Sequence, residues 1–213
     1  MSGDHDHDHG PEHPGIHPDI ELPEPARRAI AMHELLVEKG VLDPGELAEQ
    51  IQRVRSRSAA DGARVVARAW VDPAFKARLL RDARSAVAEL GYTLTHDAEL
   101  AVVENTAAVH HLVVCTLCSC YPTALLGPPP DWYKSGPYRQ RAVFEPRAVM
   151  REFGLEVAGH VQVRVVDSTA DLRYLVLPRR PAGTEGLAEE ELAELVTRDS
   201  MIGVTDPLEV RSP

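Results

Sequence analysis

Residues 112–120 read Leu112-Val113-Val114-Cys115-Thr116-Leu117-Cys118-Ser119-Cys120, and the three cysteines of this stretch are the only ones in the chain. The apolar start of the stretch is typical of a short buried strand. The cysteines follow at spacings of three and two, which places their sulfurs on one side of a tight loop. Because thiolates bind soft and borderline metal ions, segment 115–120, called the claw below, predicts a metal site in a loop after a strand.

The spacing of the cysteines leaves the identity of the metal open. A structural zinc site usually has four ligands, so zinc would need a histidine such as His110 or His111. An iron–sulfur cluster normally takes four cysteines, and a redox pair of two cysteines would leave the third unexplained. The backbone amides between the last two sulfurs must also lie close to the metal. A donor set this rich in electrons suits a trivalent transition metal better than zinc.

Upstream of the claw, residues 27–91 have the pattern of helices. Asp43-Pro44 and Asp72-Pro73 each predict a helix start, with Asp as the N-cap and Pro in the first turn. The second of these helices is expected to run to Gly91. Gly62 is expected to interrupt the helix before it. The segment therefore predicts a helical arm.

Downstream of residue 91, the spacing of the apolar residues changes from the helical pattern to one typical of strands. Apolar runs at 100–103 and 112–114 predict strands, and so does the alternation of Val161, Val163 and Val165 with polar residues. Further elements are expected at 146–153 and 189–197 (helices) and at 171–178 (a strand). The fold class is α+β, with the N-terminal helical arm followed by a layered α/β domain. The predicted divisions are a tail at 1–25, the arm at 26–91 and a metal-binding catalytic domain at 92–213.

Composition narrows the possible functions. The tail is rich in His, Asp and Pro, which predicts a disordered, solvated segment that could also collect divalent metal. The 213-residue chain has a net charge of −10 and no long apolar run, so neither nucleic acid nor a membrane is an expected partner. The N-terminus lacks the basic start and apolar stretch of a secretory signal. We therefore expect a cytoplasmic protein, where clustered cysteines favour metal binding over disulfides.

The residues around the claw resemble the α subunit of nitrile hydratase and the related γ subunit of thiocyanate hydrolase. The similarity covers about residues 30–204. The motifs that carry it are residues 114–122, Trp132-Tyr133-Lys134-Ser135, Tyr138-Arg139, Glu145-Pro146-Arg147, Arg173-Tyr174, residues 179–186 and Val196-Thr197-Arg198-Asp199.

This resemblance implies a low-spin, non-corrin Co(III) or a non-haem Fe(III). The ligands would be the sulfurs of Cys115, Cys118 and Cys120 and the backbone nitrogens of Ser119 and Cys120. The sixth position would take water, hydroxide or substrate. Cys118 is expected as a sulfinic acid and Cys120 as a sulfenic acid. Thr116 matches the cobalt-type variant of the family, so cobalt is expected, with iron as the alternative.

The resemblance also implies an enzyme, a hydro-lyase that hydrates a nitrile to its amide, with Cys118, Ser119 and Cys120 at the catalytic centre. Arginines of a partner would neutralise the oxidised cysteines. The expected partners are a β subunit or two smaller β-like subunits, and an activator that delivers cobalt. Two alternatives stay open: a γ subunit of thiocyanate hydrolase, and a non-catalytic metal-binding protein loaded through its His-rich tail.

The chain departs from the family at three positions. Thr123 stands where nitrile hydratases usually have Trp and thiocyanate hydrolase has Arg. Because Thr is smaller than Trp and uncharged, we expect a wider substrate pocket that suits bulky or heteroaromatic nitriles. Asp171 replaces a Glu, and His96 replaces a Gln. Both are expected just outside the metal ligands, where they could tune proton transfer.

Overall fold

A computed structural model describes residues 23–94 and 98–210 of the chain. The predicted disorder of the tail lies, except for its last three residues, outside these ranges, and so does His96. The chain divides into two compact units, Met1–Gln50 and Ile51–Pro213. The division predicted at residue 91 stays a prediction. Among the described residues no helix is both long and apolar enough to cross a membrane.

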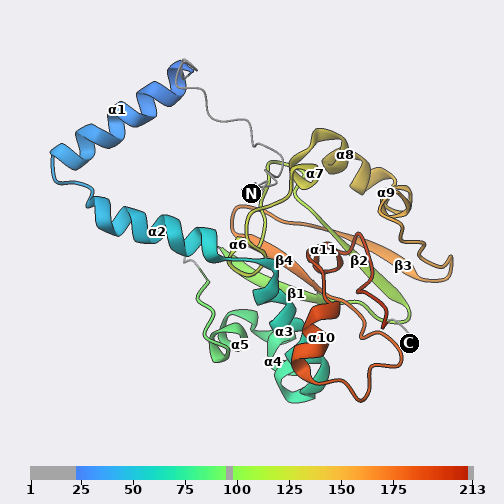
Figure 1. Ribbon diagram of the computed structural model, residues 1–213. Helices are drawn as coiled ribbons and strands as arrows, with labels where there is room; N and C mark the ends of the chain where they lie inside the picture. Colours follow the sequence, from blue (N-terminus) through green and yellow to red (C-terminus); the bar gives the residue numbers. More distant parts are fainter. Residues whose placement is uncertain (1–22, 95–97, 211–213) are drawn as a thin grey trace, which may run out of the picture. The chain divides into compact units, whose positions relative to one another are not determined.

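The first unit holds α1 (Glu24–Glu38) and the first half of α2 (Pro44–Ser56), which lie in the first part of the helical arm predicted at 26–91 (Figure 1). α2 begins at the predicted residue, and the carboxylate of Asp43 accepts a hydrogen bond from the backbone N–H of Glu46 at 2.9 Å. No residue of α1 is buried, and Ile30 is 46% exposed. The arm therefore forms from local signals and keeps its apolar side chains accessible.

The second unit begins with α3 (Ala59–Val71), α4 (Pro73–Arg81) and α5 (Ala83–Glu89). α4 starts as predicted, because the carboxylate of Asp72 accepts a hydrogen bond from Phe75 N–H at 2.9 Å. The single helix expected from there is wrong. Asp82 breaks it by accepting a hydrogen bond from Ser85 N–H at 3.1 Å, which caps a new helix. A short polar side chain competes here with the backbone for its own hydrogen bonds.

The expected interruption at Gly62 is also wrong, since α3 runs through this residue. Gly62 is buried, and a Cβ atom there would lie 2.7 Å from Leu126 Cδ2 and 2.8 Å from Met201 Sδ. The glycine thus serves close packing of α3 against two later helices rather than a helix end.

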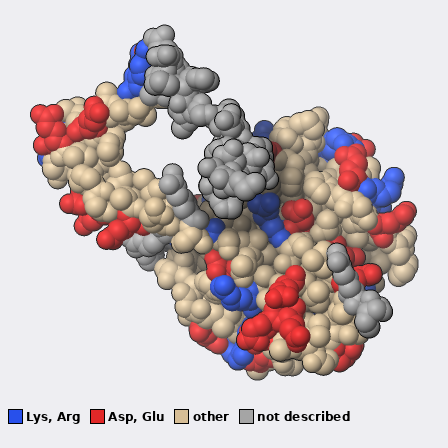
Figure 2. Space-filling model, viewed as in Figure 1, with Lys and Arg blue, Asp and Glu red and all other residues tan. Residues whose placement is uncertain are grey.

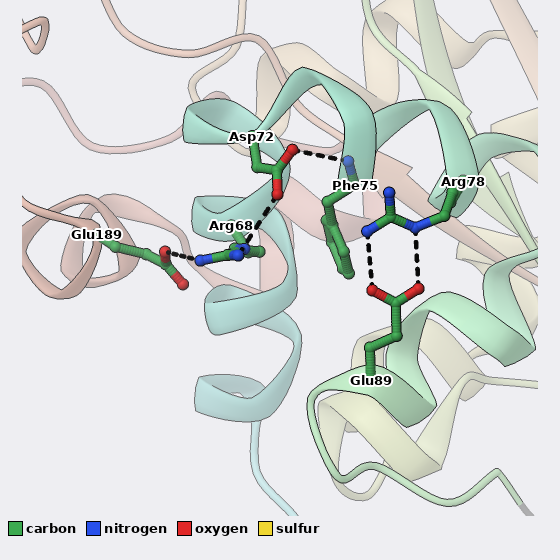
Figure 3. Close-up of polar contacts among 6 residues, drawn as sticks. All are labelled: Arg68, Asp72, Phe75, Arg78, Glu89 and Glu189. Atoms are coloured by element: carbon green, nitrogen blue, oxygen red, sulfur yellow. Dashed lines mark hydrogen bonds and ion pairs between the residues drawn. The ribbon is translucent and has the colours of Figure 1, made fainter.

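Ion pairs connect the helices of this unit (Figure 3). Arg68 on α3 lies 3.4 Å from the carboxylate of Asp72 and 3.2 Å from that of Glu189. Arg78 on α4 donates two hydrogen bonds to Glu89, at 2.9 and 2.8 Å. Because these pairs are open to solvent, they orient the helices more than they stabilise them.

Four strands lie at the centre of the second unit (Figure 1). They are β1 (Glu99–Glu104), β2 (Val109–Val114), β3 (Gln162–Asp167) and β4 (Leu172–Leu177). β1 pairs in parallel with β4, and β2 pairs in parallel with β3. The predicted strands are therefore confirmed, and the first and last strands form one pair while the two middle strands form the other. The register of β2 and β3 places Val114, the last residue before the claw, opposite Asp167.

Short helices follow the claw and the last strand. They are α6 (Thr123–Leu126), α7 (Asp131–Lys134), α8 (Gly136–Phe144), α9 (Pro146–Glu152), α10 (Glu189–Leu195) and α11 (Arg198–Ile202). The predicted helices at 146–153 and 189–197 are confirmed, although the second ends early because Thr197 caps α11. The first turn of α10 carries three glutamates, and Figure 2 shows acidic side chains gathered in this part of the molecule.

A close contact between α11 and β2 fixes the strand that leads into the claw. Gly203 ends α11 with a φ of +86°, and a Cβ there would lie 1.9 Å from the carbonyl oxygen of His111. His110 Nε2 is 2.8 Å from the Gly203 carbonyl oxygen, to which it donates. Only glycine meets both demands, since it tolerates positive φ and needs no room for a side chain.

Candidate metal centre

The claw leaves the core at the end of β2. Cys115 is fully buried, whereas Cys118 is exposed and Cys120 is half-buried. The Val114 carbonyl accepts a hydrogen bond from Ser168 N–H at 2.7 Å, so the strand pair stays closed up to the first cysteine. The three cysteines therefore lie just beyond the end of the strand pair of β2 and β3. The sulfur of Cys115 is buried, and that of Cys118 faces solvent.

The three sulfurs converge on one point, as the spacing predicts. Sγ of Cys118 lies 3.5 Å from Sγ of Cys115 and 3.2 Å from Sγ of Cys120, and all three lie within 4.8 Å of one another. Around a tetrahedral zinc ion with Zn–S bonds of about 2.3 Å, sulfurs would lie about 3.8 Å apart; at right angles around an octahedral ion they would lie about 3.3 Å apart. The 3.2 and 3.5 Å separations are closer to the right-angle spacing than to the tetrahedral one.

The two histidines that could complete a zinc site have other hydrogen-bond partners. His110 and His111 are buried on β2 and share hydrogen bonds with Asn105. Within the part of the chain that the structure describes, the metal-binding group consists of the three cysteines alone.

The thiols of the claw differ in acidity. Hydrogen bonds from the Cys120 and Cys115 thiols lower the pKa of Cys118 to about 7. Burial, together with the hydrogen bond to Cys118, raises the pKa of Cys120 to about 12. Cys118 thus ionises more readily than Cys120, and its exposure also leaves it more open to oxidants. A bound cation would favour ionisation of the remaining thiols.

Asp167 holds the first turn of the claw. Its two carboxylate oxygens accept hydrogen bonds from Thr116, one from the backbone N–H at 2.9 Å and one from the hydroxyl at 2.6 Å. Asp167 is the last residue of β3, directly opposite Val114. The parallel strand pair therefore brings a carboxylate to the claw from about fifty residues away in sequence.

Two side chains from the helices after the claw fix its backbone. The Tyr133 hydroxyl donates to the Cys120 carbonyl at 2.8 Å, and Arg139 Nη1 donates to the Leu117 carbonyl at 3.2 Å. The Tyr133 ring is fully buried and packs edge-on against Tyr121, with ring centroids 4.9 Å apart. An aromatic layer thus supports the last peptide groups of the claw.

A cavity of about 200 Å³ has Tyr121, the residue that follows the claw, in its wall. Its wall includes Tyr121 to Leu125, with Thr123 among them, and Arg173 from β4. The Arg173 guanidinium is close enough to Cys120 to oppose the rise in its pKa. The cavity and the claw are therefore neighbours, and the residue singled out as the pocket residue lines it.

Asp171 has a different place from the other predicted residues. It is exposed before β4, and its backbone carbonyl accepts a hydrogen bond from Glu99 N–H at 2.7 Å. Its carboxylate makes no hydrogen bond or ion pair within residues 23–94 and 98–210. Its role just outside the metal ligands stays a prediction, as does that of His96, which lies outside the described residues.

Sequence reasoning assigned no role to Asp167, Tyr133, Arg139 or Arg173. The last three belong to the motifs quoted above, but their partners depend on contacts between distant segments. Asp167 is the last residue of β3 and belongs to none of those motifs. Its link to Thr116 follows only once the register of β2 and β3 is known.

Comparisons with known proteins agree with this geometry. Residues 23–205 match the family model described as nitrile hydratase, alpha chain. The low-molecular weight cobalt-containing nitrile hydratase subunit alpha of Rhodococcus rhodochrous is 52% identical over 183 residues, which are 85% of this chain and 88% of that protein. The thiocyanate hydrolase subunit gamma of Thiobacillus thioparus is 41% identical over 189 residues, 84% of this chain and 78% of that protein.

A solved structure shows the same fold. A double mutant of the Fe-type nitrile hydratase from Comamonas testosteroni Ni1 superimposes with a TM-score of 0.81 at 38% identity. The match covers 88% of this chain and 94% of that one.

Proposed function

The chain belongs to the nitrile hydratase alpha-chain family, and on that premise we propose that it is the metal-binding α subunit of an enzyme that hydrates a nitrile to the corresponding amide. The observation that carries the proposal is the convergence of three sulfurs, 3.2 and 3.5 Å apart, in a loop held by the sheet and by α7 and α8. This arrangement suits the binding of a single metal ion by three sulfurs.

We propose Co(III) as that ion, with Fe(III) as the alternative. The relative that is 52% identical is named as cobalt-containing, whereas the Fe-type structure is 38% identical. Thr116, the residue that matches the cobalt type, is held by two hydrogen bonds to Asp167. The ligands would be the sulfurs of the three cysteines and the backbone nitrogens of Ser119 and Cys120.

In this proposal the bound trivalent ion supplies Lewis acidity, which makes a nitrile carbon or a water molecule reactive. The residues of the chain hold the claw and the substrate in place. Tyr133 fixes the carbonyl of Cys120, and Asp167 fixes the first turn of the claw. The cavity beside Thr123 receives the substituent of the nitrile, so that its reactive end points toward Cys118, Ser119 and Cys120.

The acidities of the thiols support the expected modification of the claw. Cys118 is exposed and has the lowered pKa, two features that favour oxidation. We therefore propose Cys118 as the sulfinic acid. Cys120, half-buried and directly before Tyr121 of the cavity wall, is proposed as the sulfenic acid.

A partner subunit is needed to complete the site. Leu117, an apolar residue within the claw, is 85% exposed. Exposed apolar side chains beside a reactive centre mark a surface that another protein covers. We propose a β-type partner, either one chain or two smaller ones, which would exclude water and supply cations to the oxidised sulfurs. A cobalt-delivery activator is proposed for loading.

The substrate class follows from the cavity. Thr123 leaves space where the family usually has Trp, so bulky or heteroaromatic nitriles are proposed as preferred substrates. The second candidate function is thiocyanate hydrolysis, and it is favoured by Arg173, whose positive charge in the cavity wall would attract an anion. Thr123, in contrast, does not supply the arginine of that family.

The test is an assay of the complex assembled with its β-type partner and activator. Acetonitrile, a large aryl nitrile and thiocyanate are compared as substrates. We expect amide from the aryl nitrile at the highest kcat/KM and no turnover by Cys115→Ala. Turnover of thiocyanate without nitrile hydration would support the second candidate. No turnover of either, with unmodified thiols, would favour a metal-storage role.

A further inference from the structure

Arg139 contacts the claw directly. Arg139 lies in the first turns of α8, and its Nη1 donates to the Leu117 carbonyl at 3.2 Å. The neighbouring residue Tyr138 donates its hydroxyl to the Val113 carbonyl at 2.6 Å. Two consecutive residues of α8 thus anchor the helix to β2 and to the claw. The position of Arg139 is therefore set by the fold rather than by a freely moving side chain.

The carbonyl that Arg139 contacts belongs to a peptide group with a second partner. The N–H of the same peptide group is that of Cys118, and it donates to Cys115 Sγ at 3.3 Å. A guanidinium at one end of an amide draws electrons toward the oxygen, which makes the N–H at the other end a stronger donor. Arg139, one peptide group and a sulfur thus form a continuous chain of hydrogen bonds.

The sulfur end of this chain is the buried end. Cys115 is 0% exposed and the hydrogen bond to its sulfur is partly buried, whereas the contact of Arg139 with Leu117 lies at the surface. Arg139 Nε is buried and has no hydrogen-bond partner among the described residues, so the guanidinium lies partly out of solvent as well. Electrostatic effects grow where water is excluded.

We infer that Arg139 is a positioning residue that tunes Cys115 through the peptide group between Leu117 and Cys118. The inference deepens the proposed function, on which it rests only for the statement that Cys115 is a metal ligand. Hydrogen bonds to a ligating sulfur withdraw electron density from the metal and change its properties. Arg139 thereby raises the Lewis acidity available at the site without touching the substrate.

The test reads the amide of Cys118 directly. In a complex whose α chain alone carries ¹⁵N-labelled cysteine, only three backbone amides of that chain are labelled, since it has only three cysteines. Arg139→Met should accelerate hydrogen exchange of the Cys118 amide about fivefold to tenfold, the change expected when one hydrogen bond is weakened. In the cobalt-loaded complex, the sulfur-to-metal absorption band should move to longer wavelength.

Arg141→Met is the matched control. It removes an arginine from the same helix, but one whose partners are Glu145 and Glu152. It should leave the exchange rate and the band unchanged. Arg139→Gln removes the charge and keeps a polar side chain, so it should act in the same direction as Arg139→Met if that variant does not fold.

An unchanged Cys118 exchange rate in either folded Arg139 variant would overturn the inference, and so would an equal change in Arg141→Met. Failure of the proposed function would be measured differently. In that case the unaltered complex would hydrate no nitrile. The exchange rate of the Cys118 amide tests the role of Arg139 independently of which substrate the complex turns over.

Discussion

Thr116 and Asp167 are joined by two hydrogen bonds, at 2.9 and 2.6 Å, that tie the first turn of the claw to the end of β3. Neither residue is among the proposed metal ligands. Together they fix the backbone at the point where the claw passes from the buried Cys115 to its exposed residues. The cysteine loop is thus tied to the strand pair of β2 and β3 by contacts with a distant segment.

Asp167→Asn should weaken the retention of metal. An amide offers one acceptor oxygen where the carboxylate has two, so one of the two Thr116 donors loses its partner. We expect cobalt to be lost to a chelator about fivefold to tenfold faster, as for the loss of one hydrogen bond. Asp131→Asn, which removes an exposed carboxylate paired with Lys134, is the control and should lose cobalt at the original rate. Equal rates for Asp167→Asn and the unaltered protein would contradict this role.

Tyr133→Phe should destabilise the protein and disturb the claw. It leaves the Cys120 carbonyl without its 2.8 Å donor, which costs about 1–3 kcal/mol of the free energy of unfolding for a buried group. Tyr121→Phe is a sharp comparison, because the Tyr121 hydroxyl is buried with no hydrogen-bond partner among the described residues. Its removal should be neutral or stabilising. Denaturant unfolding measures the free energy of unfolding of both variants. A larger loss in Tyr121→Phe than in Tyr133→Phe would contradict the hydrogen-bond partners assigned to the two hydroxyls.

Thr123→Trp should change the substrate range. The indole would fill much of the 200 Å³ cavity that Thr123 lines. We expect kcat/KM for a large aryl nitrile to fall at least tenfold relative to that for acetonitrile, since one or two lost apolar contacts are worth that much. Thr123→Ser keeps the opening and serves as the control. A preserved preference for the aryl nitrile in Thr123→Trp would place the substrate elsewhere.

Stability should fall in mild acid because of His111. Burial is the main cause that lowers its pKa below 6.5, and the charges of Arg164 and His110 add to it. The unfolded chain therefore binds a proton more readily than the folded protein, and the free energy of unfolding decreases as the pH falls through 6.5 toward the lower pKa of the folded state. His111→Gln should flatten this part of the profile, whereas His160→Gln, at an exposed position, should not. Identical profiles for both variants would assign the pH dependence to another group.

The sequence predicts best those features that local chemistry decides. Asp43-Pro44 and Asp72-Pro73 start helices because a short carboxylate and a fixed φ act within one turn. The claw is equally local, because three cysteines within six residues place their sulfurs close together. The break at Asp82 was missed, although a side-chain cap of the same kind produces it.

Contacts between distant segments could not be predicted in this way. The pairing of β1 with β4 and of β2 with β3 joins strands that are about fifty to seventy residues apart. Asp167 reaches Thr116 only through that pairing. Gly62 was expected to interrupt a helix, and no role was expected for Gly203, but the neighbours of both in the folded protein demand the absence of a side chain.

The central claim is that the three cysteines form one modified metal centre, and mass spectrometry with metal analysis of the native complex tests it most directly. The account predicts about one cobalt per chain and a peptide spanning residues 115–120 that carries about three added oxygens, two on Cys118 and one on Cys120. Zinc in place of cobalt, or a peptide with three unmodified thiols in an active complex, would contradict it.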